Sequence, residues 1–149
     1  MDIRKILVPF DFSEYSEKAF TWALEMADKW RSRILLLHVV PAPSYPPMLM
    51  GTYLNVSEFE ASLQADAEAR AKEFVGKSRH RPVQVDTQVI IGEPFGDICR
   101  IAEQEKMDLI VMGSHGRTGL SHVLLGSVAE RVVRHAPCPV LVVGKKTHV

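Results

Sequence analysis

The residues with the clearest chemical potential lie between positions 113 and 127, where four glycines occur within fourteen positions. Glycine accepts positive φ angles and lets an anion approach backbone N–H groups without a Cβ in the way. A helix expected to begin at Ser127 would add free N–H groups and the positive end of its dipole. Arg117, within the same segment, could donate a charge-assisted hydrogen bond. The pattern therefore predicts a phosphate-binding loop.

Two structural explanations of the same residues remain open. The glycines could serve only the geometry of a tight connection between a strand and a helix. Ser127 and Glu130 also fit the S-x-x-E capping box, in which the two side chains satisfy the first turn of a helix without any ligand. Four glycines are more than one turn requires, which favours the phosphate interpretation.

The rest of the chain must position this loop, and it alternates short apolar runs with helical periods, as is typical of a parallel sheet covered by helices. Strands are predicted at residues 5–9, 34–40, 83–91, 109–112 and 139–143. Helices are predicted from a cap at Asp11 or Ser13 and then at 56–77, 94–105 and 127–134, and the proline-rich residues 41–55 predict a loop. The first two helices are predicted to face inward with Tyr15, Ala19, Trp22, Ala23, Met26 and Trp30, and with Val56, Phe59, Leu63, Ala67, Ala71 and Phe74.

Five strands and four crossovers predict one domain over residues 1–149, an α/β fold with a doubly wound, Rossmann-like five-stranded parallel sheet and helices on both faces. Polar and apolar residues alternate strictly along 83–91, which places that strand at an edge with one wet face. We predict the strand order 3-2-1-4-5. The ligand crevice would then open at the carboxyl ends of the first and fourth strands, where the glycines begin.

The composition excludes several classes of partner. Eighteen basic and eighteen acidic residues cancel, so the chain lacks the charge expected of a nucleic-acid-binding protein. No apolar run approaches the roughly 20 residues that span a bilayer. The first apolar run is also shorter than the apolar segment of a signal peptide. Cys99 and Cys138 fit no zinc or redox spacing and are expected to be buried in a reducing compartment. We expect a cytoplasmic protein that binds neither nucleic acid nor membrane.

The spacing Gly113-x2-Gly116-x9-Gly126-Ser127 resembles the G-x2-G-x9-G-[ST] nucleotide motif of the universal stress protein family. The resemblance covers essentially the whole chain, with further matching segments at residues 6–11 (Ile-Leu-Val-Pro-Phe-Asp), 37–39, 92–94, 108–116 and 138–143. It implies a fold like that of the adenine nucleotide alpha hydrolases and a nucleotide between the ends of strands one and four.

The resemblance to the ATP-binding branch of that family also implies a set of binding residues. The adenosine side would be lined by Pro9, Phe10 and Asp11, with Val39 near the base, and the floor would be closed by Met112 and Gly113. Ribose and phosphates would be held by His115, Gly116, Gly126, Ser127 and Val128, to which the loop itself adds Arg117 as a phosphate contact. The implied ligand is ATP, AMP or ADP, with or without Mg²⁺. Phe10 is bulkier than the residue often found there, so the packing of the base is expected to differ.

Other titratable residues offer little chemistry. Asp11 could be a helix cap, a turn residue, or a contact to adenosine or to a metal ion on the phosphates. His115 and His122 lack clustered acidic or cysteine partners, so we predict no metal centre, and His38 is expected to be a hydrogen-bonded core residue. Because no triad or pair of carboxylates is visible, we predict no catalytic residues. A slow ATP hydrolase or phosphotransferase, and a nucleotide-free dimerisation module, remain alternatives.

The last strand, Pro139 to Val143, forms the other edge of the predicted sheet. A continuous apolar edge strand invites pairing with another chain, and a symmetric antiparallel dimer would cover it. The resemblance implies the same arrangement. The basic pair Lys145-Lys146 is too short to cover the edge instead. The sequence therefore predicts a homodimeric, nucleotide-binding sensor of the stress response.

Overall fold

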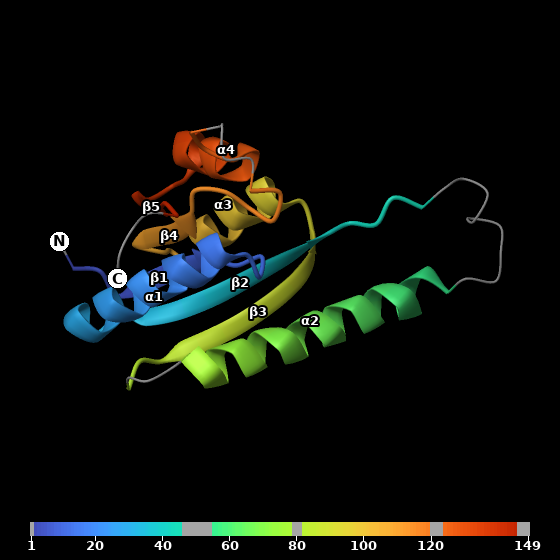
Figure 1. The fold of residues 1–149 in the computed structure, drawn as a ribbon, viewed down its shortest axis with the longest axis horizontal. Coiled ribbons are helices and arrows are strands. Elements are labelled where there is room, and N and C mark those ends of the chain that lie inside the picture. The colour runs from blue at the N-terminus through green and yellow to red at the C-terminus, as the bar shows by residue number, and fades with distance from the viewer. Residues whose placement is uncertain (1, 46–54, 79–81, 120–123, 146–149) are drawn as a thin grey trace.

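The computed structural model describes residues 2–45, 55–78, 82–119 and 124–145, which form one parallel five-stranded sheet with helices on both faces (Figure 1). The strands are β1 Lys5–Pro9, β2 Arg33–Pro41, β3 Val85–Gly92, β4 Leu109–Gly113 and β5 Val140–Val143. The helices are α1 Glu14–Trp30, α2 Val56–Ser78, α3 Pro94–Gln104 and α4 Ser127–His135. The strand order is β3-β2-β1-β4-β5, so the predicted fold class and order are confirmed.

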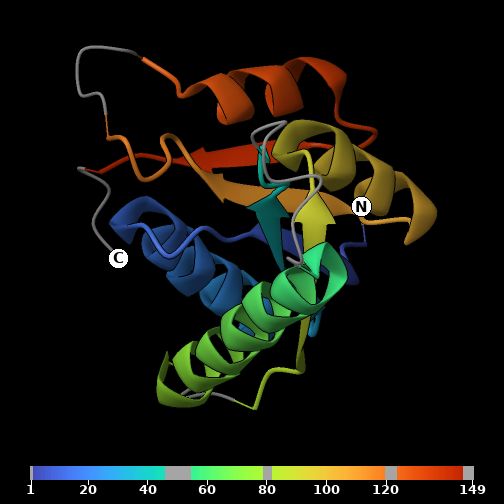
Figure 2. The same ribbon diagram turned by 90° about the vertical axis from the view of Figure 1, so that its right-hand side faces the viewer.

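The order of the strands creates a switch point between β1 and β4. From β1 the chain moves outward to β2 and β3, and α1 and α2 lie on one face of the sheet. It then returns to the other side of β1, and α3 and α4 cover the opposite face, as Figure 2 shows. Right-handed crossovers produce this division of the helices. The carboxyl ends of β1 and β4 therefore lie side by side, with α1 and α2 on one face of the sheet and α3 and α4 on the other.

Alternate residues of the central strands enter two separate cores. Ile6 and Val8 of β1 pack with α1 and α2, whereas Leu7 between them packs with α3 and α4. Successive side chains of a strand point to opposite faces, so one apolar run serves both cores. Every residue of β4 is buried, as expected for a strand covered on both sides. This rigid centre holds the strand ends in place.

The predicted inward face of α1 is only partly correct. Tyr15, Ala19 and Ala23 are buried, but Trp30 is 39% exposed. The helix ends at Trp30, and Arg31 takes a left-handed conformation with φ 56°. Trp30 is therefore the last residue of the helix, directly before the left-handed turn.

The prediction for α2 also fails at one end. Ala67 and Ala71 are buried as expected, together with Val75, but Phe59 is 49% exposed. The beginning of α2 extends past the end of β3 in Figure 1, and the helix meets the strand by Gln64, which donates to the carbonyl of Val89 at 2.9 Å. Residues 46–54 of the predicted loop lie outside the described residues.

Both edge strands are where the sequence places them. Asp86 and Gln88 of β3 are exposed while Val89 is buried, which confirms the wet face. The strand begins at Val85, two residues later than predicted, and β5 forms the opposite edge. Over the residues that the structure describes, no helix has both the length and the apolar character of a membrane span.

Candidate functional site

The segments after β1 and β4 meet at the switch point of the sheet. Nε of Arg117 donates a hydrogen bond of 2.8 Å to the backbone carbonyl of Asp11, which lies 106 residues earlier in the chain. A Cβ placed on Gly116 would lie 2.8 Å from Oδ2 of Asp11. The glycine segment therefore lies against the end of β1, as the predicted crevice requires.

Asp11 is held in a defined orientation by its neighbours. Its Oδ1 accepts a hydrogen bond of 3.0 Å from the backbone N–H of Ser13, and its own N–H donates to the hydroxyl of Ser16. Ser13, not Asp11, caps α1, because its side chain accepts from the N–H of Ser16. Asp11 is thus a turn residue whose second carboxylate oxygen faces Gly116.

Helix α4 begins without a side-chain cap. Gly126 occupies the N-cap position, and no side chain accepts from the first turn. Ser127 is already the first helical residue, so the predicted capping box with Glu130 is wrong, because that box needs the serine one position earlier. Glu130 instead pairs with Arg134 at 2.9 Å. The first-turn N–H groups have no acceptor within the helix, and the positive end of its dipole points at the glycine segment.

Two of the glycines have structural reasons of their own. A Cβ on Gly113 would lie 2.7 Å from Cβ of Tyr15 and 2.8 Å from its carbonyl carbon, so only glycine lets α1 pack there. The N–H of Gly126 already donates to the carbonyl of Ser114 at 2.7 Å and is not available to a ligand. The first-turn amides of α4 and the guanidinium of Arg117 are among the groups that remain for an anion.

His115 lies between these groups. Its Nδ1 is 2.9 Å from the hydroxyl of the buried Ser114, and its ring centroid is 5.3 Å from that of Tyr15. A Cβ on Gly126 would be 3.2 Å from Cα of His115, so the histidine lies next to the start of α4. Sequence reasoning missed Ser114, whose position directly after a buried strand was the available signal.

The side chains expected near a base are mostly part of the core. Phe10 is 3% exposed and packs against Phe74 with a centroid distance of 4.5 Å, so its ring belongs to the core. Val39 and Met112 are likewise buried in the second core, and Val128 packs against it. Pro9 is buried at the end of β1. A ligand would therefore contact mainly the backbone atoms of these residues and the edges of their side chains.

His38 is buried and hydrogen-bonded, which confirms its predicted core role. Its Nδ1 is 2.6 Å from the carbonyl of Phe10, and because a carbonyl can only accept, Nδ1 carries the proton. Burial lowers the pKa of His38, the hydrogen bond to Phe10 opposes that shift, and the nearby charge of Arg117 adds to it. The neutral ring therefore links the end of β2 to the end of β1.

The structure offers little for a metal. No group of three His, Cys, Asp or Glu side chains gathers in the described ranges, and His122 lies outside them. Cys99 and Cys138 are free and half-buried, and burial raises the pKa of both thiols. Asp11 is the carboxylate beside Gly116.

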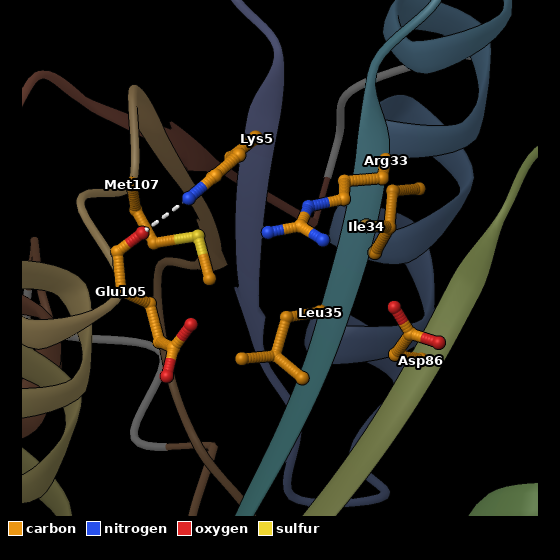
Figure 3. A pocket seen from close by; sticks show the side chains of 7 residues that line it. All are labelled: Lys5, Arg33, Ile34, Leu35, Asp86, Glu105 and Met107. Atoms are coloured by element: carbon orange, nitrogen blue, oxygen red, sulfur yellow. Dashed lines mark hydrogen bonds between the residues drawn. The ribbon is translucent and has the colours of Figure 1, made fainter.

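A small cavity lies at the other end of the sheet, where β1, β2 and β3 begin. It measures about 90 Å³, and Lys5 donates to the carbonyl of Glu105 beside it at 2.8 Å, while Arg33 extends from β2 toward β1 (Figure 3). A wider groove of about 390 Å³ lies near Arg31 and Gln84. Parallel sheets bind ligands at the carboxyl ends of their strands, whereas both hollows lie at the amino ends.

Comparison with known proteins points to one family. Residues 2–144 match the model of the universal stress protein family. Universal stress protein MJ0531 of Methanocaldococcus jannaschii is 36% identical over 95% of this chain and 82% of its own. The solved structure of MJ0577 from the same organism has a TM-score of 0.84 at 32% identity, covering 99% of this chain and 100% of that one. An Archaeoglobus fulgidus universal stress protein in complex with dAMP has a TM-score of 0.63 at 22% identity over 96% and 99% of the two chains, a likeness of fold.

Proposed function

The chain belongs to the universal stress protein family, and from that premise we propose that it binds an adenine nucleotide where β1 and β4 end. The observation that carries the proposal is the uncapped first turn of α4, which begins beside Gly116 in the glycine segment. Amides at a helix N-terminus and an arginine are a common combination for phosphate. The dAMP bound to the A. fulgidus protein supports an adenine nucleotide as the class of ligand.

The proposed roles follow the positions of the residues. The N–H groups of Ser127 and Val128, together with Arg117, hold the phosphates of ATP, ADP or AMP. Gly116 leaves room for the ligand beside Asp11, whose Oδ2 is placed to meet Mg²⁺ when the ion arrives with the phosphates. His115 lies where it can contact the ribose or a phosphate. The remaining predicted contacts are Pro9, Phe10, Val39, Met112, Gly113 and Gly126, which shape the walls rather than donate to the ligand.

We infer that the protein acts as a homodimer through β5. The carbonyls of Pro139 and Val143 accept hydrogen bonds from Ile110 and Ser114, so these odd-numbered residues face β4. Backbone groups alternate in direction along a strand, and Val140 and Val142 therefore present theirs to the open edge. A second copy paired antiparallel with this edge would satisfy them.

The dimer would report nucleotide occupancy as a sensor of the stress response in the cytoplasm. The free state of Cys99 and Cys138 supports a reducing compartment. Binding rather than turnover is proposed because the sequence shows no triad and no pair of carboxylates at this site. Release of phosphate from ATP and Mg²⁺ by the purified dimer, lost in Asp11→Ala, would instead establish a hydrolase.

The proposal is tested by Ser127→Asp. A carboxylate in the first turn of α4 suits the helix dipole but repels phosphate, so stability should hold while affinity for ATP falls by at least about tenfold. Ser57→Asp adds the same charge to the first turn of α2 and should leave the affinity unchanged. Calorimetric titration with ATP and AMP, and chromatography of nucleotide released on denaturation, give the readouts. A wild-type protein that carries no nucleotide and titrates with neither would overturn the proposal.

A further inference from the structure

Two basic residues, Lys5 and Arg33, lie side by side where β1 and β2 begin. They are partners in the parallel register of these strands, so their side chains leave the sheet on the same face. Both line the small cavity, and in Figure 3 the guanidinium of Arg33 is turned toward the strand that carries Lys5. Like charges directly opposite each other on neighbouring strands destabilise a sheet. An anion between the two cations would remove this electrostatic cost.

Neither cation is paired with a carboxylate in the part of the chain that the structure describes. Arg33 makes no side-chain hydrogen bond or ion pair with those residues. Lys5 donates to the backbone carbonyl of Glu105 at 2.8 Å, which uses one of its three ammonium hydrogens and brings no charge. The carboxylate of Asp108 accepts instead from the backbone N–H groups of Arg4 and Lys5, both at 2.9 Å. Both cations therefore retain donors for a ligand.

Two carboxylates also line the cavity, and they lie at its rim. Oδ2 of Asp86 accepts a hydrogen bond of 3.2 Å from Nε2 of Gln84, and Figure 3 shows its side chain on β3, across Arg33 from Lys5. The side chain of Glu105 is exposed and forms no ion pair with Lys5. These carboxylates would repel a second negative charge on a ligand. An anion with one charge therefore suits the cavity better than one with two.

The size and the walls of the cavity restrict its ligand further. The cavity measures about 90 Å³. A protein cavity of about 150 Å³ holds benzene, so this one has room for roughly four or five non-hydrogen atoms. Leu35 and Met107 form apolar walls beside the two cations. Such walls offer no donors to the oxygens of a phosphate, whereas they suit the alkyl group of a small organic acid.

We propose that this cavity binds a short monocarboxylate, such as acetate or propionate. The carboxylate lies between Lys5 and Arg33, and the alkyl group lies against Leu35 and Met107. A guanidinium donates two parallel N–H bonds to a carboxylate, and the ammonium adds another charge-assisted bond. A ligand of about five non-hydrogen atoms allows a dissociation constant on the order of a millimolar. The cavity shares no residue with the proposed nucleotide site, so carboxylate binding does not depend on a nucleotide.

The test titrates ¹⁵N-labelled protein with sodium propionate, with sodium chloride exchanged to keep the ionic strength constant. The amide resonances of Leu35 and Met107 should shift along a saturable curve. Arg33→Gln should weaken binding by at least about tenfold, because hydrogen bonds to a charged group are lost. Arg4→Gln is the matched control and should leave the affinity unchanged. It removes an equal charge, but Arg4 pairs with Asp2 at 2.7 Å and does not line the cavity.

A series of ligands tests the apolar walls. Propionate should bind roughly tenfold more tightly than formate, since each buried carbon contributes about a fourfold gain in affinity. Inorganic phosphate should bind more weakly than propionate, because its second charge meets the acidic rim and it carries no alkyl group. Phosphate that binds more tightly than propionate, or formate that binds equally well, would overturn the assignment of a monocarboxylate.

A measurement on the unaltered protein guards against a variant that fails to fold. Nuclear Overhauser effects should join the methyl protons of bound propionate to the ε-methyl group of Met107. A wild-type protein whose resonances ignore propionate, or an Arg33→Gln protein that binds it as tightly as the wild type, would overturn the carboxylate site and leave the proposed function standing. A wild-type protein that binds propionate but no ATP would instead overturn the proposed function alone.

Discussion

Gly113 lies directly on the backbone of Tyr15, since a Cβ at position 113 would come within 2.8 Å of the tyrosine carbonyl carbon. This contact joins the last residue of β4 to the first turn of α1. The backbone of a helix cannot move aside as a flexible side chain can. The first glycine of the nucleotide motif thus has a packing role that is separate from any ligand.

We therefore expect Gly113→Ala to destabilise the protein by about 1–3 kcal/mol, the usual cost of forcing atoms into a packed region. Gly76→Ala is the matched control, because a Cβ there meets nothing within 4 Å and the residue lies in α2. That change should stabilise the fold by roughly 0.5–1 kcal/mol. Urea denaturation measures both. Equal stability of the two variants would show that Gly113 is not constrained by Tyr15.

The buried His38 predicts how stability depends on pH. Because burial lowers its pKa below the ordinary 6.5, the unfolded chain takes up the proton at a higher pH than the folded one. The contribution of His38 is complete above about pH 6.5 and declines as the pH falls toward the lowered folded value. Thermal unfolding from pH 7.5 to 5.5 should show this loss, with a shallower slope in His38→Gln. His135→Gln, at an exposed position, controls for the loss of a histidine; if both variants keep the wild-type slope, the assignment to His38 is wrong.

The direction of the backbone in β5 gives a test of the dimer. Val142→Pro removes an N–H that faces the open edge, where proline is tolerated, and spares the hydrogen bonds to β4. It should yield a folded monomer in sedimentation equilibrium. Leu141→Pro removes an N–H that faces β4 and should unfold the edge, seen by circular dichroism. A Val142→Pro protein that still sediments as a dimer would place the contact elsewhere.

The strand order and the two layers of helices were accessible from the sequence for a physical reason. Strands buried on both faces read as continuous apolar runs, as in β4, while β3 alternates because one face is wet. The glycine segment was likewise visible, because its residues are neighbours in the chain. Local patterns of this kind depend little on where distant parts of the protein lie.

Other features depend on contacts that no local pattern contains. The periodicity of α1 and α2 gave no sign of where the sheet ends, and so Trp30 and Phe59 were wrongly placed inside. The capping box of Ser127 and Glu130 is absent because the helix begins one residue earlier than that box requires. No local pattern sets Arg70 apart from the other charges of α2, and its contact with Phe12 arises only when α2 packs beside the end of β1.

With the proposed nucleotide bound at the start of α4, the uncapped first turn would draw part of its stability from the ligand. Gly126 has no side chain to cap α4, so the helix start lacks that stabilising hydrogen bond. A ligand at 100 times its dissociation constant stabilises the folded state by about 2.7 kcal/mol. Chains that lose the ligand would open more often and reach proteases sooner. Cellular abundance would then follow the adenylate pool without any change in transcription, so turnover itself would carry the signal.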